Sequence, residues 1–533
     1  MAFEDVVTMF RIFVGRSVCV RAGHHHCQNQ QYVLATRRFC SQNNKNHRIA
    51  IVGSGPSGCY SAKYIQAAWK KAGKPIPHID ILERLPTPYG LVRFGVAPDH
   101  PEVKNVQNDF DQLFTTMEQE ESKVRFFGNV QVGRDVSIAQ LREMYHAVVL
   151  ATGCETDRRL NIPGSDLEGI LSAREFVNWY NGHPDFLHIG DKVAAALGSN
   201  PNEARVCVIG QGNVALDCAR IVAKGRPGLF STDITSHALT VLQDGVGTVS
   251  IVGRRGHVQG AFTIKELREL VKLKEEGFDT SFFVRQYELD LGATEASLAE
   301  LNGPGGRPRV RIDKLLREAS AASDDNAASK AIHLRFLLNP VAFEPHPTKP
   351  SALGSVRCER TRLEGEAGHQ RAVGTGEYES IPADLALVSI GYKGTAIPGV
   401  EKWFDEARGV MVHQNGKVDS ATSNSGGLYT VGWVKRGPTG IIGSNITDAK
   451  DTVATIVQDA ETDFDTISLS SSSMDLDALL ADCAVVTWEG YQRIQAAEAS
   501  GKRSEDQPRE KIVDLKRQIE IGTGKPGENM FTI

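Results

Sequence analysis

Glycines recur at two places in this 533-residue chain with the spacing Gly-x-Gly-x-x-Gly or its close variant Gly-x-Gly-x-x-Ala. The first set is Gly53, Gly55 and Gly58, and the second set begins with Gly210 and Gly212. In such turns the first glycine makes a tight turn and the second lets backbone N–H groups approach a pyrophosphate. The third small residue lets a helix pack closely on a strand. Both segments therefore predict dinucleotide-binding turns.

The first turn lies between elements that suit this role. Apolar residues 49–52 precede it, a helix-compatible stretch of residues 59–71 follows it, and a second apolar run, 78–82, ends at Glu83. Short apolar runs of this kind are typical of buried parallel strands. A carboxylate at the end of the second strand can accept hydrogen bonds from both ribose hydroxyls of an adenosine. The alternative, an ordinary glycine-rich loop, would not require these three flanking features.

The second turn has the same context but a different ending. Apolar residues 206–209 precede it, a helical stretch of residues 216–222 follows, and the second strand is expected at residues 248–252. Arg254 and Arg255 follow that strand, where the first unit has its acid. Guanidinium groups donate hydrogen bonds that suit a 2′-phosphate, so the second nucleotide is predicted to be NADP(H). Without this context, a solvated surface pair of arginines would be the better interpretation.

Two dinucleotide turns with unlike second strands predict two different nucleotides, FAD at the first and NADPH at the second. Hydride transfer from nicotinamide to flavin needs no nucleophile, because the cofactors carry the chemistry. The catalytic side chains therefore stay unknown, and no metal site is expected. Asp99 and His100 are the candidates considered for a proton relay, since histidine titrates near neutrality. Pro98 and Pro101 flank them and favour a structural or flavin-packing role.

Composition narrows the classes of protein. The nine cysteines form no C-x-x-C pair, which argues against a zinc knuckle, an iron–sulfur run or a dithiol relay. The chain has 60 basic and 65 acidic residues, and this acidic excess makes nucleic acid an unexpected partner. No apolar run reaches about 18 residues, so no transmembrane segment is predicted. The length suggests several domains.

Residues 1–47 differ from the rest of the chain. They contain six basic and two acidic residues, and they lack the uninterrupted apolar region of a secretory signal. The sequence Arg-Arg-Phe-Cys-Ser at residues 37–41 resembles a processing site. The pattern predicts a mitochondrial transit peptide, with plastid targeting or a plain basic tail as the alternatives.

Two apolar runs that end in glycine, residues 147–153 and 385–391, indicate where the chain passes between domains. We expect an α/β fold with two Rossmann-like dinucleotide-binding domains. The predicted boundaries are residues 48–152 for the first part of the FAD domain, 153–387 for an inserted NADPH-binding domain, and 388–533 for the second part of the FAD domain with a C-terminal extension.

Longer segments carry a resemblance to a known family. These are residues 90–106, 209–217, 251–255, 262–270 and 431–440. They resemble the signature of adrenodoxin reductase, the mitochondrial ferredoxin–NADP reductase. The resemblance implies a glutathione reductase-like fold with non-covalent FAD. It also implies that NADPH electrons pass singly to an acidic, adrenodoxin-like [2Fe–2S] ferredoxin.

The resemblance also implies which residues contact each partner. The FAD contacts would be Gly53, Gly55, Ser57, Gly58, Glu83, Leu91, Val132, Trp433, Gly440, Ile441 and Ile442. The NADPH contacts would be Gln211, Gly212, Asn213, Val214, Arg254, Arg255, Glu266 and Gly440. The ferredoxin contacts would be Arg307 and Arg311, which lie in a dense basic cluster. The alternative for that cluster is a solvated helix start.

The resulting hypothesis is an NADPH:ferredoxin oxidoreductase, expected as a monomer in the mitochondrial matrix, with a peripheral association with the inner membrane also considered. One alternative is an NADPH-dependent flavin monooxygenase or oxidase, in which oxygen takes the electrons. A non-enzymatic FAD-binding redox sensor is a further alternative. The last 60 or so residues carry no motif that assigns them a role.

Overall fold

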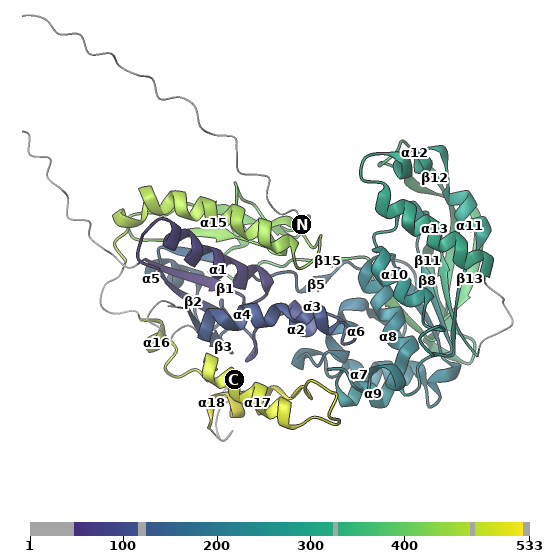
Figure 1. The fold of residues 1–533 in the computed structure, drawn as a ribbon, viewed down its shortest axis with the longest axis horizontal. Helices are drawn as coiled ribbons and strands as arrows, with labels where there is room; N and C mark the ends of the chain where they lie inside the picture. The colour runs from purple at the N-terminus through teal and green to yellow at the C-terminus, as the bar shows by residue number, and fades with distance from the viewer. Residues whose placement is uncertain (1–46, 116–123, 323–328, 470–474, 526–533) are drawn as a thin grey trace, which may run out of the picture. The chain divides into compact units, whose positions relative to one another are not determined.

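The computed structural model describes residues 47–115, 124–322, 329–469 and 475–525 (Figure 1). Its elements include two six-stranded sheets, each built mainly from parallel strands. The predicted transit peptide lies outside the described residues apart from His47, whose ring centroid is 5.2 Å from that of Phe464. The fold class predicted from the sequence, α/β with two Rossmann-like units, is confirmed.

The first sheet has the order β18-β19-β4-β1-β2-β3. Its pairs are parallel except β18 with β19, and its central strands are buried on both faces, as their apolar sequences require. Helix α1 packs against α15 beside this sheet. The bounds are β1 Arg48–Val52, β2 His78–Glu83, β3 Val124–Gly128, β4 Ala147–Leu150, β18 Lys417–Asp419, β19 Gly427–Thr430, α1 Pro56–Lys71 and α15 Ser444–Thr462.

Short helices follow β2 and flank the first sheet. They are α2 Leu91–Phe94, α3 Pro101–Lys104, α4 Val106–Thr115, α5 Ile138–Met144 and α14 Trp433–Arg436. Ser137 caps α5 by accepting a hydrogen bond from the backbone N–H of Gln140, whose side-chain oxygen in turn accepts one from the backbone N–H of Ser137.

The second sheet has the order β6-β14-β7-β8-β10-β9, and all its pairs are parallel. Its strands are β6 Ile170–Ser172, β7 Arg205–Ile209, β8 Thr248–Val252, β9 Thr280–Val284, β10 Lys330–Arg335 and β14 Leu385–Val388. Its helices are α6 Ala173–Tyr180, α7 Ile189–Leu197, α8 Asn213–Leu229, α9 Ser236–Leu242 and α10 Ile264–Val271.

The chain passes between the two sheets through a short ribbon. Strand β5, Thr156–Asp157, follows β4 and pairs in antiparallel fashion with β15, Tyr392–Lys393, which follows β14. Strands β1 to β4, up to residue 150, and β18 and β19, residues 417–430, belong to the first sheet. The strands of the second sheet lie between residues 170 and 388, a range that also holds a separate antiparallel sheet at residues 338–382. The domain boundaries given above stay a prediction.

Several elements have no counterpart among the sequence predictions. An antiparallel sheet contains β11 Leu338–His346, β12 Lys349–Glu364 and β13 Arg371–Pro382. Helices α11 Gln286–Gly292, α12 Glu295–Asn302 and α13 Arg307–Ala322 precede it, and α16 Leu476–Leu479, α17 Trp488–Ser500 and α18 Leu515–Thr523 end the described chain. Among the described residues, no helix combines the length and the apolar character needed to cross a bilayer.

Candidate functional site

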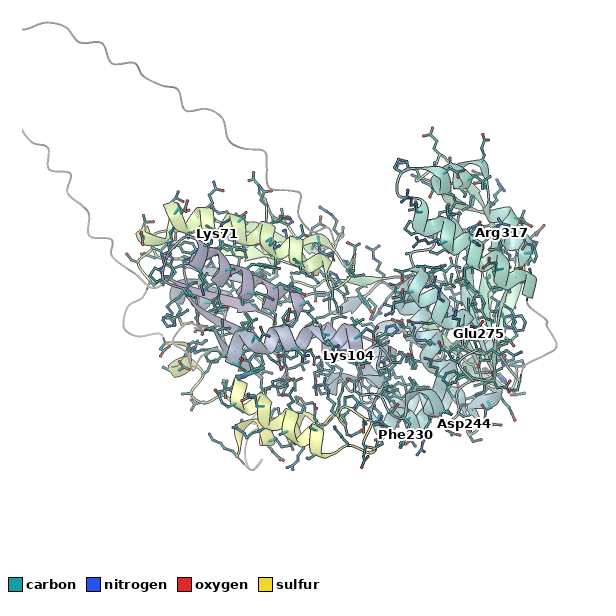
Figure 2. All side chains as sticks on the ribbon, in the orientation of Figure 1. Lys71, Lys104, Phe230, Asp244, Glu275 and Arg317 are labelled. Atoms are coloured by element: carbon teal, nitrogen blue, oxygen red, sulfur yellow. The ribbon has the colours of Figure 1, made fainter. Side chains whose placement is uncertain are left out.

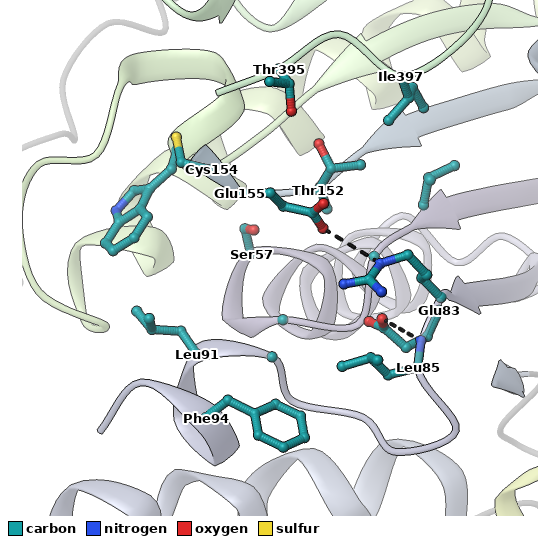
Figure 3. A pocket seen from close by; sticks show the side chains of 18 of the residues that line it. Ser57, Glu83, Leu85, Leu91, Phe94, Thr152, Cys154, Glu155, Thr395 and Ile397 are labelled. Atoms are coloured by element: carbon teal, nitrogen blue, oxygen red, sulfur yellow. Dashed lines mark hydrogen bonds and ion pairs between the residues drawn. The ribbon is translucent and has the colours of Figure 1, made fainter. Parts of the chain in front are cut away.

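A cavity of about 450 Å³ lies at the carboxyl ends of β1, β2 and β4 (Figure 3). Ligands of open parallel sheets bind at this edge, because the strands end there and the connecting turns leave a crevice. Seven of the residues that the resemblance assigns to FAD line this cavity. They are Gly53, Gly55, Ser57, Glu83, Leu91, Val132 and Trp433.

The first glycine turn forms one wall of the cavity. Gly53 has a φ of +105°, and a Cβ atom there would lie 2.6 Å from the carbonyl oxygen of Ala151. A Cβ atom on Gly58 would lie 2.1 Å from the carbonyl oxygen of Gly53. Gly55, in contrast, has no heavy atom within 4 Å of its Cβ position and precedes the N-terminus of α1. The open face of Gly55 at a helix N-terminus fits the pyrophosphate of FAD.

Glu83 ends β2 with its carboxylate held in place. One oxygen accepts hydrogen bonds from the backbone nitrogen and hydroxyl of Ser54, at 3.0 and 2.6 Å, and the other accepts from the Leu85 nitrogen at 3.1 Å. A carboxylate has about four acceptor sites, so it can still receive bonds from a ribose. The adenosine end of FAD therefore fits here.

Trp433 lines the cavity from α14. Its ring lies 5.5 Å from that of Tyr392 on the connecting ribbon, and its buried Nε1–H has no hydrogen-bond partner among the described residues. Because Trp433 lines the cavity, an acceptor on a ligand bound there could pair with this donor. The residues present thus fit a flavin nucleotide.

Four residues assigned to FAD do not line the cavity. Gly58 lies at the contact of α1 with the turn, which is a packing role. Gly440, Ile441 and Ile442 lie in the loop before α15, and Ile441 is 67% exposed. Their contacts with FAD stay a prediction.

Sequence reasoning missed other residues of the cavity lining. Arg84 forms ion pairs with Asp185 at 2.7 Å and with Glu155 at 3.9 Å, and all three side chains line the cavity. Burial raises the pKa of the Cys154 thiol to about 12, so this side chain stays protonated. Arg84 had a local signal, its place beside the acid that ends β2, and Cys154 directly follows the apolar run of residues 147–153. Asp185 comes from a distant segment that carried no signal.

The second glycine turn joins β7 to α8. A Cβ atom on Gly210 would lie 2.1 Å from the Ser389 carbonyl oxygen, while that of Gly212 has nothing within 4 Å. The Gln211 side chain donates to the Arg335 carbonyl oxygen at 2.8 Å, and Asn213 Oδ1 accepts from the Thr263 nitrogen at 2.8 Å. These two side chains hold the turn to its neighbours, and Gly212 leaves an opening at the start of α8 for a phosphate.

The predicted 2′-phosphate site lies after β8. Arg254 and Arg255 are exposed there, and the Arg255 side chain donates a hydrogen bond to the Gln259 carbonyl oxygen at 3.4 Å. Glu266 lies in the first turn of α10 and accepts a hydrogen bond from the Thr263 hydroxyl. Val214 is half-buried in the first turn of α8. The donors of the arginine pair are thus available to an anion.

Asp99 and His100 lie in a network of buried charges instead of the cavity lining. Asp99 receives two hydrogen bonds from Arg220 at 2.8 and 2.9 Å, and His100 Nε2 lies 2.7 Å from a carboxylate oxygen of Glu269. Burial alone would raise the pKa of the Asp99 carboxyl, but Arg220 holds that pKa well below its ordinary value. These pairs join the segment before α3 to α8 and α10 of the second sheet.

Arg307 and Arg311 are exposed at the start of α13. Neither forms an ion pair with a residue in the described ranges, whereas Arg309 lies 3.9 Å from Glu300. This first turn of the helix therefore presents unneutralised positive charge to solvent.

Comparison with known proteins assigns the chain to a family. A model described as pyridine nucleotide-disulphide oxidoreductase matches residues 47–274. The human protein named "NADPH:adrenodoxin oxidoreductase, mitochondrial" is 40% identical over 91% of this chain and 95% of its own length. The chain belongs to the NADPH:adrenodoxin oxidoreductase family.

Other members of the NADPH:adrenodoxin oxidoreductase family agree in length and fold. The Arabidopsis thaliana protein of the same name is 39% identical over 90% of this chain and 96% of its own length. The solved structure titled "Mycobacterium tuberculosis FprA in complex with NADPH" is 36% identical, covers 90% of this chain and all of its own, and has a TM-score of 0.78. The recognition made from the sequence motifs is confirmed.

Proposed function

We propose that this enzyme transfers electrons from NADPH through FAD to an adrenodoxin-type ferredoxin. The observation that carries the proposal is the pair of glycine turns at the carboxyl ends of two parallel sheets, one followed by Glu83 and the other by Arg254 and Arg255. Full-length relatives named for this activity support it.

The chain's own residues bind and orient the two nucleotides. Bound FAD would supply the redox chemistry, because a flavin can accept a hydride and release electrons one at a time. Gly55 and the N-terminus of α1 would hold the FAD pyrophosphate, Glu83 its ribose, and the Nε1–H of Trp433 would donate to an acceptor of the bound cofactor. Leu91 would contribute an apolar wall that excludes water.

NADPH would lie along the second turn. Backbone N–H groups at the start of α8, beside Gly212, would bind its pyrophosphate, and Arg254 and Arg255 would bind its 2′-phosphate. We assign Gln211 and Asn213 to holding this turn in shape, since both side chains already have partners in the protein.

The partner is an adrenodoxin-type ferredoxin, and the finer proposal is an acidic [2Fe–2S] protein that docks on α13. Exposed Arg307 and Arg311 support this, because complementary charge raises the encounter rate.

We further propose that the protein is mitochondrial, lies in the matrix as a monomer with a peripheral contact to the inner membrane, and loses residues 1–47 as a transit peptide.

Anaerobic addition of NADPH to the purified protein tests the function. The yellow flavin absorbance should bleach, and subsequent addition of an oxidised [2Fe–2S] ferredoxin should restore it while the ferredoxin becomes reduced. Colourless protein that cannot be reconstituted with FAD, or a flavin that NADPH leaves oxidised, would contradict the proposal. Steady peroxide formation with no ferredoxin reduction would indicate an oxidase instead.

A further inference from the structure

The segment between α17 and α18, residues 501–514, is here called the C-terminal strap. It contacts segments attached to both sheets, although it contains no recognisable motif. Arg503 donates to the carbonyl oxygens of Phe230 and Thr232, both at 2.9 Å, beyond α8 of the second sheet. Figure 2 labels Phe230, close to the yellow ribbon of the C-terminal region. The strap is thus attached firmly to the second sheet's helices.

Lys511 is a buried lysine of the strap, with a side chain that is 0% exposed. Its ammonium group lies 3.2 Å from Asp233 Oδ2, 3.2 Å from Asn181 Oδ1 and 3.3 Å from the carbonyl oxygen of Arg93. The ammonium group thus donates two hydrogen bonds, to Asn181 and to the Arg93 carbonyl oxygen, and forms an ion pair with Asp233. Arg93 belongs to α2 of the first sheet's connections, whereas Asn181 and Asp233 belong to connections of the second.

Asn181 extends this contact to α2. It is 0% exposed, and its amide nitrogen donates to the carbonyl oxygens of Phe94 and Val96, both at 3.1 Å. Leu91 and Phe94 of α2 line the cavity assigned to FAD. Lys511 therefore contacts α2 in two ways, directly through the carbonyl oxygen of Arg93 and indirectly through Asn181.

A second buried pair holds the same short helix. Arg93 is 1% exposed and forms a two-pronged ion pair with Glu498 of α17, which is 0% exposed. The same Glu498 carboxylate accepts from the backbone nitrogen of Ile512 in the strap at 3.0 Å. A four-residue helix has little stability of its own, so its place depends on such contacts.

Asp233 completes the cluster on the side of the second sheet. It lies between Lys511 and Lys104, the last residue of α3, which Figure 2 labels. Removing one partner from buried charges of this kind leaves the others uncompensated, so the cluster tolerates one arrangement of its members. The strap, α2 and the second sheet's connections are therefore held in a single mutual position.

We propose that Lys511 is a positioning residue for hydride transfer: together with Glu498 it holds α2, the Leu91–Phe94 wall of the flavin cavity, in register with the part of the chain that carries the NADPH turn. The inference rests on the proposed function, because it requires FAD in the cavity and NADPH at the second turn. It assigns a role to the C-terminal region, whose sequence shows none.

Replacement of Lys511 by methionine tests the proposal, since Lys511→Met keeps the length of the side chain and removes its three donors. We expect the holoenzyme to bleach roughly 10- to 100-fold more slowly at saturating NADPH, because small displacements of reacting groups have effects of that size. The KM for NADPH should change little. The visible circular dichroism of the flavin should also change, and FAD should be released at a lower temperature.

Lys502→Met is the matched control, because Lys502 is an exposed lysine of the same strap. It should behave as the wild type. A Lys511→Met protein that unfolds at a lower temperature but bleaches at the wild-type rate with an unchanged flavin spectrum would overturn the positioning role. Failure of the wild type itself to bleach would instead contradict the proposed function.

Hydrogen exchange of the wild-type holoenzyme decides the matter if Lys511→Met does not fold. The backbone N–H groups of Phe94, bonded to Gly90, and Ile512, bonded to Glu498, should exchange at rates within about threefold of each other, since the proposal makes them one opening unit. Exchange at Ile512 that is far faster and independent of Phe94 would show that the strap does not hold α2.

Discussion

The two proposed nucleotide sites differ in the charged residues at or just after the end of the second strand, β2 in one and β8 in the other. Glu83 is fixed by hydrogen bonds from the Ser54 hydroxyl and the backbone at Ser54 and Leu85, so its remaining acceptor sites face the cavity. Arg254 and Arg255 are exposed instead. A carboxylate repels a phosphate and a guanidinium attracts it, so we expect this difference to separate the proposed ribose site from the proposed 2′-phosphate site.

The Arg254→Ala, Arg255→Ala double change tests this difference. Each charge-assisted hydrogen bond contributes about 1.5–3 kcal/mol, so the KM for NADPH in anaerobic bleaching should rise roughly 100-fold or more. The KM for NADH, which has no 2′-phosphate, should change little. Lys274→Ala removes another exposed cation and should leave both values unchanged. Equal losses for NADH and NADPH would contradict the 2′-phosphate assignment.

His183 provides a prediction of pH dependence. Burial lowers its pKa to about 3, and its Nδ1 accepts a hydrogen bond from the Asp185 nitrogen, which requires the neutral ring. In the unfolded chain the pKa is about 6.5, so the unfolded state takes up the proton first as the pH falls. Stability from this residue is therefore present above pH 6.5 and is lost between pH 6.5 and about 3.

Between pH 7.5 and 5.0 this loss should amount to about 2 kcal/mol of the free energy of unfolding. His183→Gln cannot take up the proton, so its urea unfolding should weaken by about 2 kcal/mol less over the same range. Any packing that the substitution removes also lowers the free energy of unfolding. Because that loss is equal at both pH values, it cancels when the change between pH 7.5 and 5.0 is compared for the two proteins. Parallel pH profiles for the two proteins would show that His183 is not held neutral in the fold.

At the scale of elements, each glycine turn contains one glycine that the fold requires and one that the fold does not require. A methyl group on Gly55 or Gly212 meets no atom within 4 Å, whereas one on Gly58 or Gly210 would lie 2.1 Å from a backbone carbonyl oxygen. The open positions also have negative φ values, of −67° and −110°, which alanine adopts without strain. Their glycines therefore leave room for a ligand and do not serve the fold.

Alanine substitutions at these glycines should give opposite results. Gly212→Ala should fold with a wild-type unfolding temperature but raise the KM for NADPH roughly tenfold or more, because the methyl group takes the space of the pyrophosphate. Gly210→Ala should lower the unfolding temperature, since its φ is +133° and its methyl group overlaps the Ser389 carbonyl. A Gly212→Ala protein with normal NADPH kinetics would contradict the phosphate site there.

Local patterns predicted the elements around the turns because their cause is local. The runs at residues 49–52, 78–82, 206–209 and 248–252 became β1, β2, β7 and β8, the last with the expected bounds. Each is a short apolar run that ends close to a residue typical of turns or strand ends. The helix after Gly210 was expected only from residue 216, yet it begins at Asn213. Helix ends depend on capping interactions more than on the apolar pattern, so the sequence predicts the first and last residues of a helix poorly.

Contacts between distant segments could not be read from the sequence. Glu498 and Arg93 are 405 residues apart, and nothing near either residue indicates the other. The same holds for Arg84 and Asp185, 101 residues apart, which both line the cavity. The sequence thus predicted the turn residues and Glu83 in the cavity lining, and the family resemblance added Leu91, Val132 and Trp433. The contacts through which we propose that the C-terminal strap holds α2 depend on tertiary packing that a single sequence does not specify.

At the scale of the whole molecule, charge is unevenly distributed. The chain has a net charge of −5, yet the first turn of α13 exposes Arg307 and Arg311 without ion-pair partners in the described chain. An acidic protein would be repelled by most of this chain and attracted at such a patch. Attraction of this kind acts on the rate of encounter and is screened by salt.

Charge reversal by Arg307→Glu with Arg311→Glu should therefore reduce kcat/KM for ferredoxin roughly tenfold or more at low ionic strength, because repulsion replaces attraction at the docking patch. Anaerobic bleaching by NADPH should be unaffected, since that step does not involve the ferredoxin. The double change Lys71→Glu with Lys502→Glu alters the net charge equally at exposed residues elsewhere and controls for it. Raising the ionic strength from about 0.01 to 0.15 M shortens the Debye length from about 30 to 8 Å and should bring the rates of variant and wild type together. Equal losses in both double variants would mean that net charge, and not α13, governs the encounter with ferredoxin.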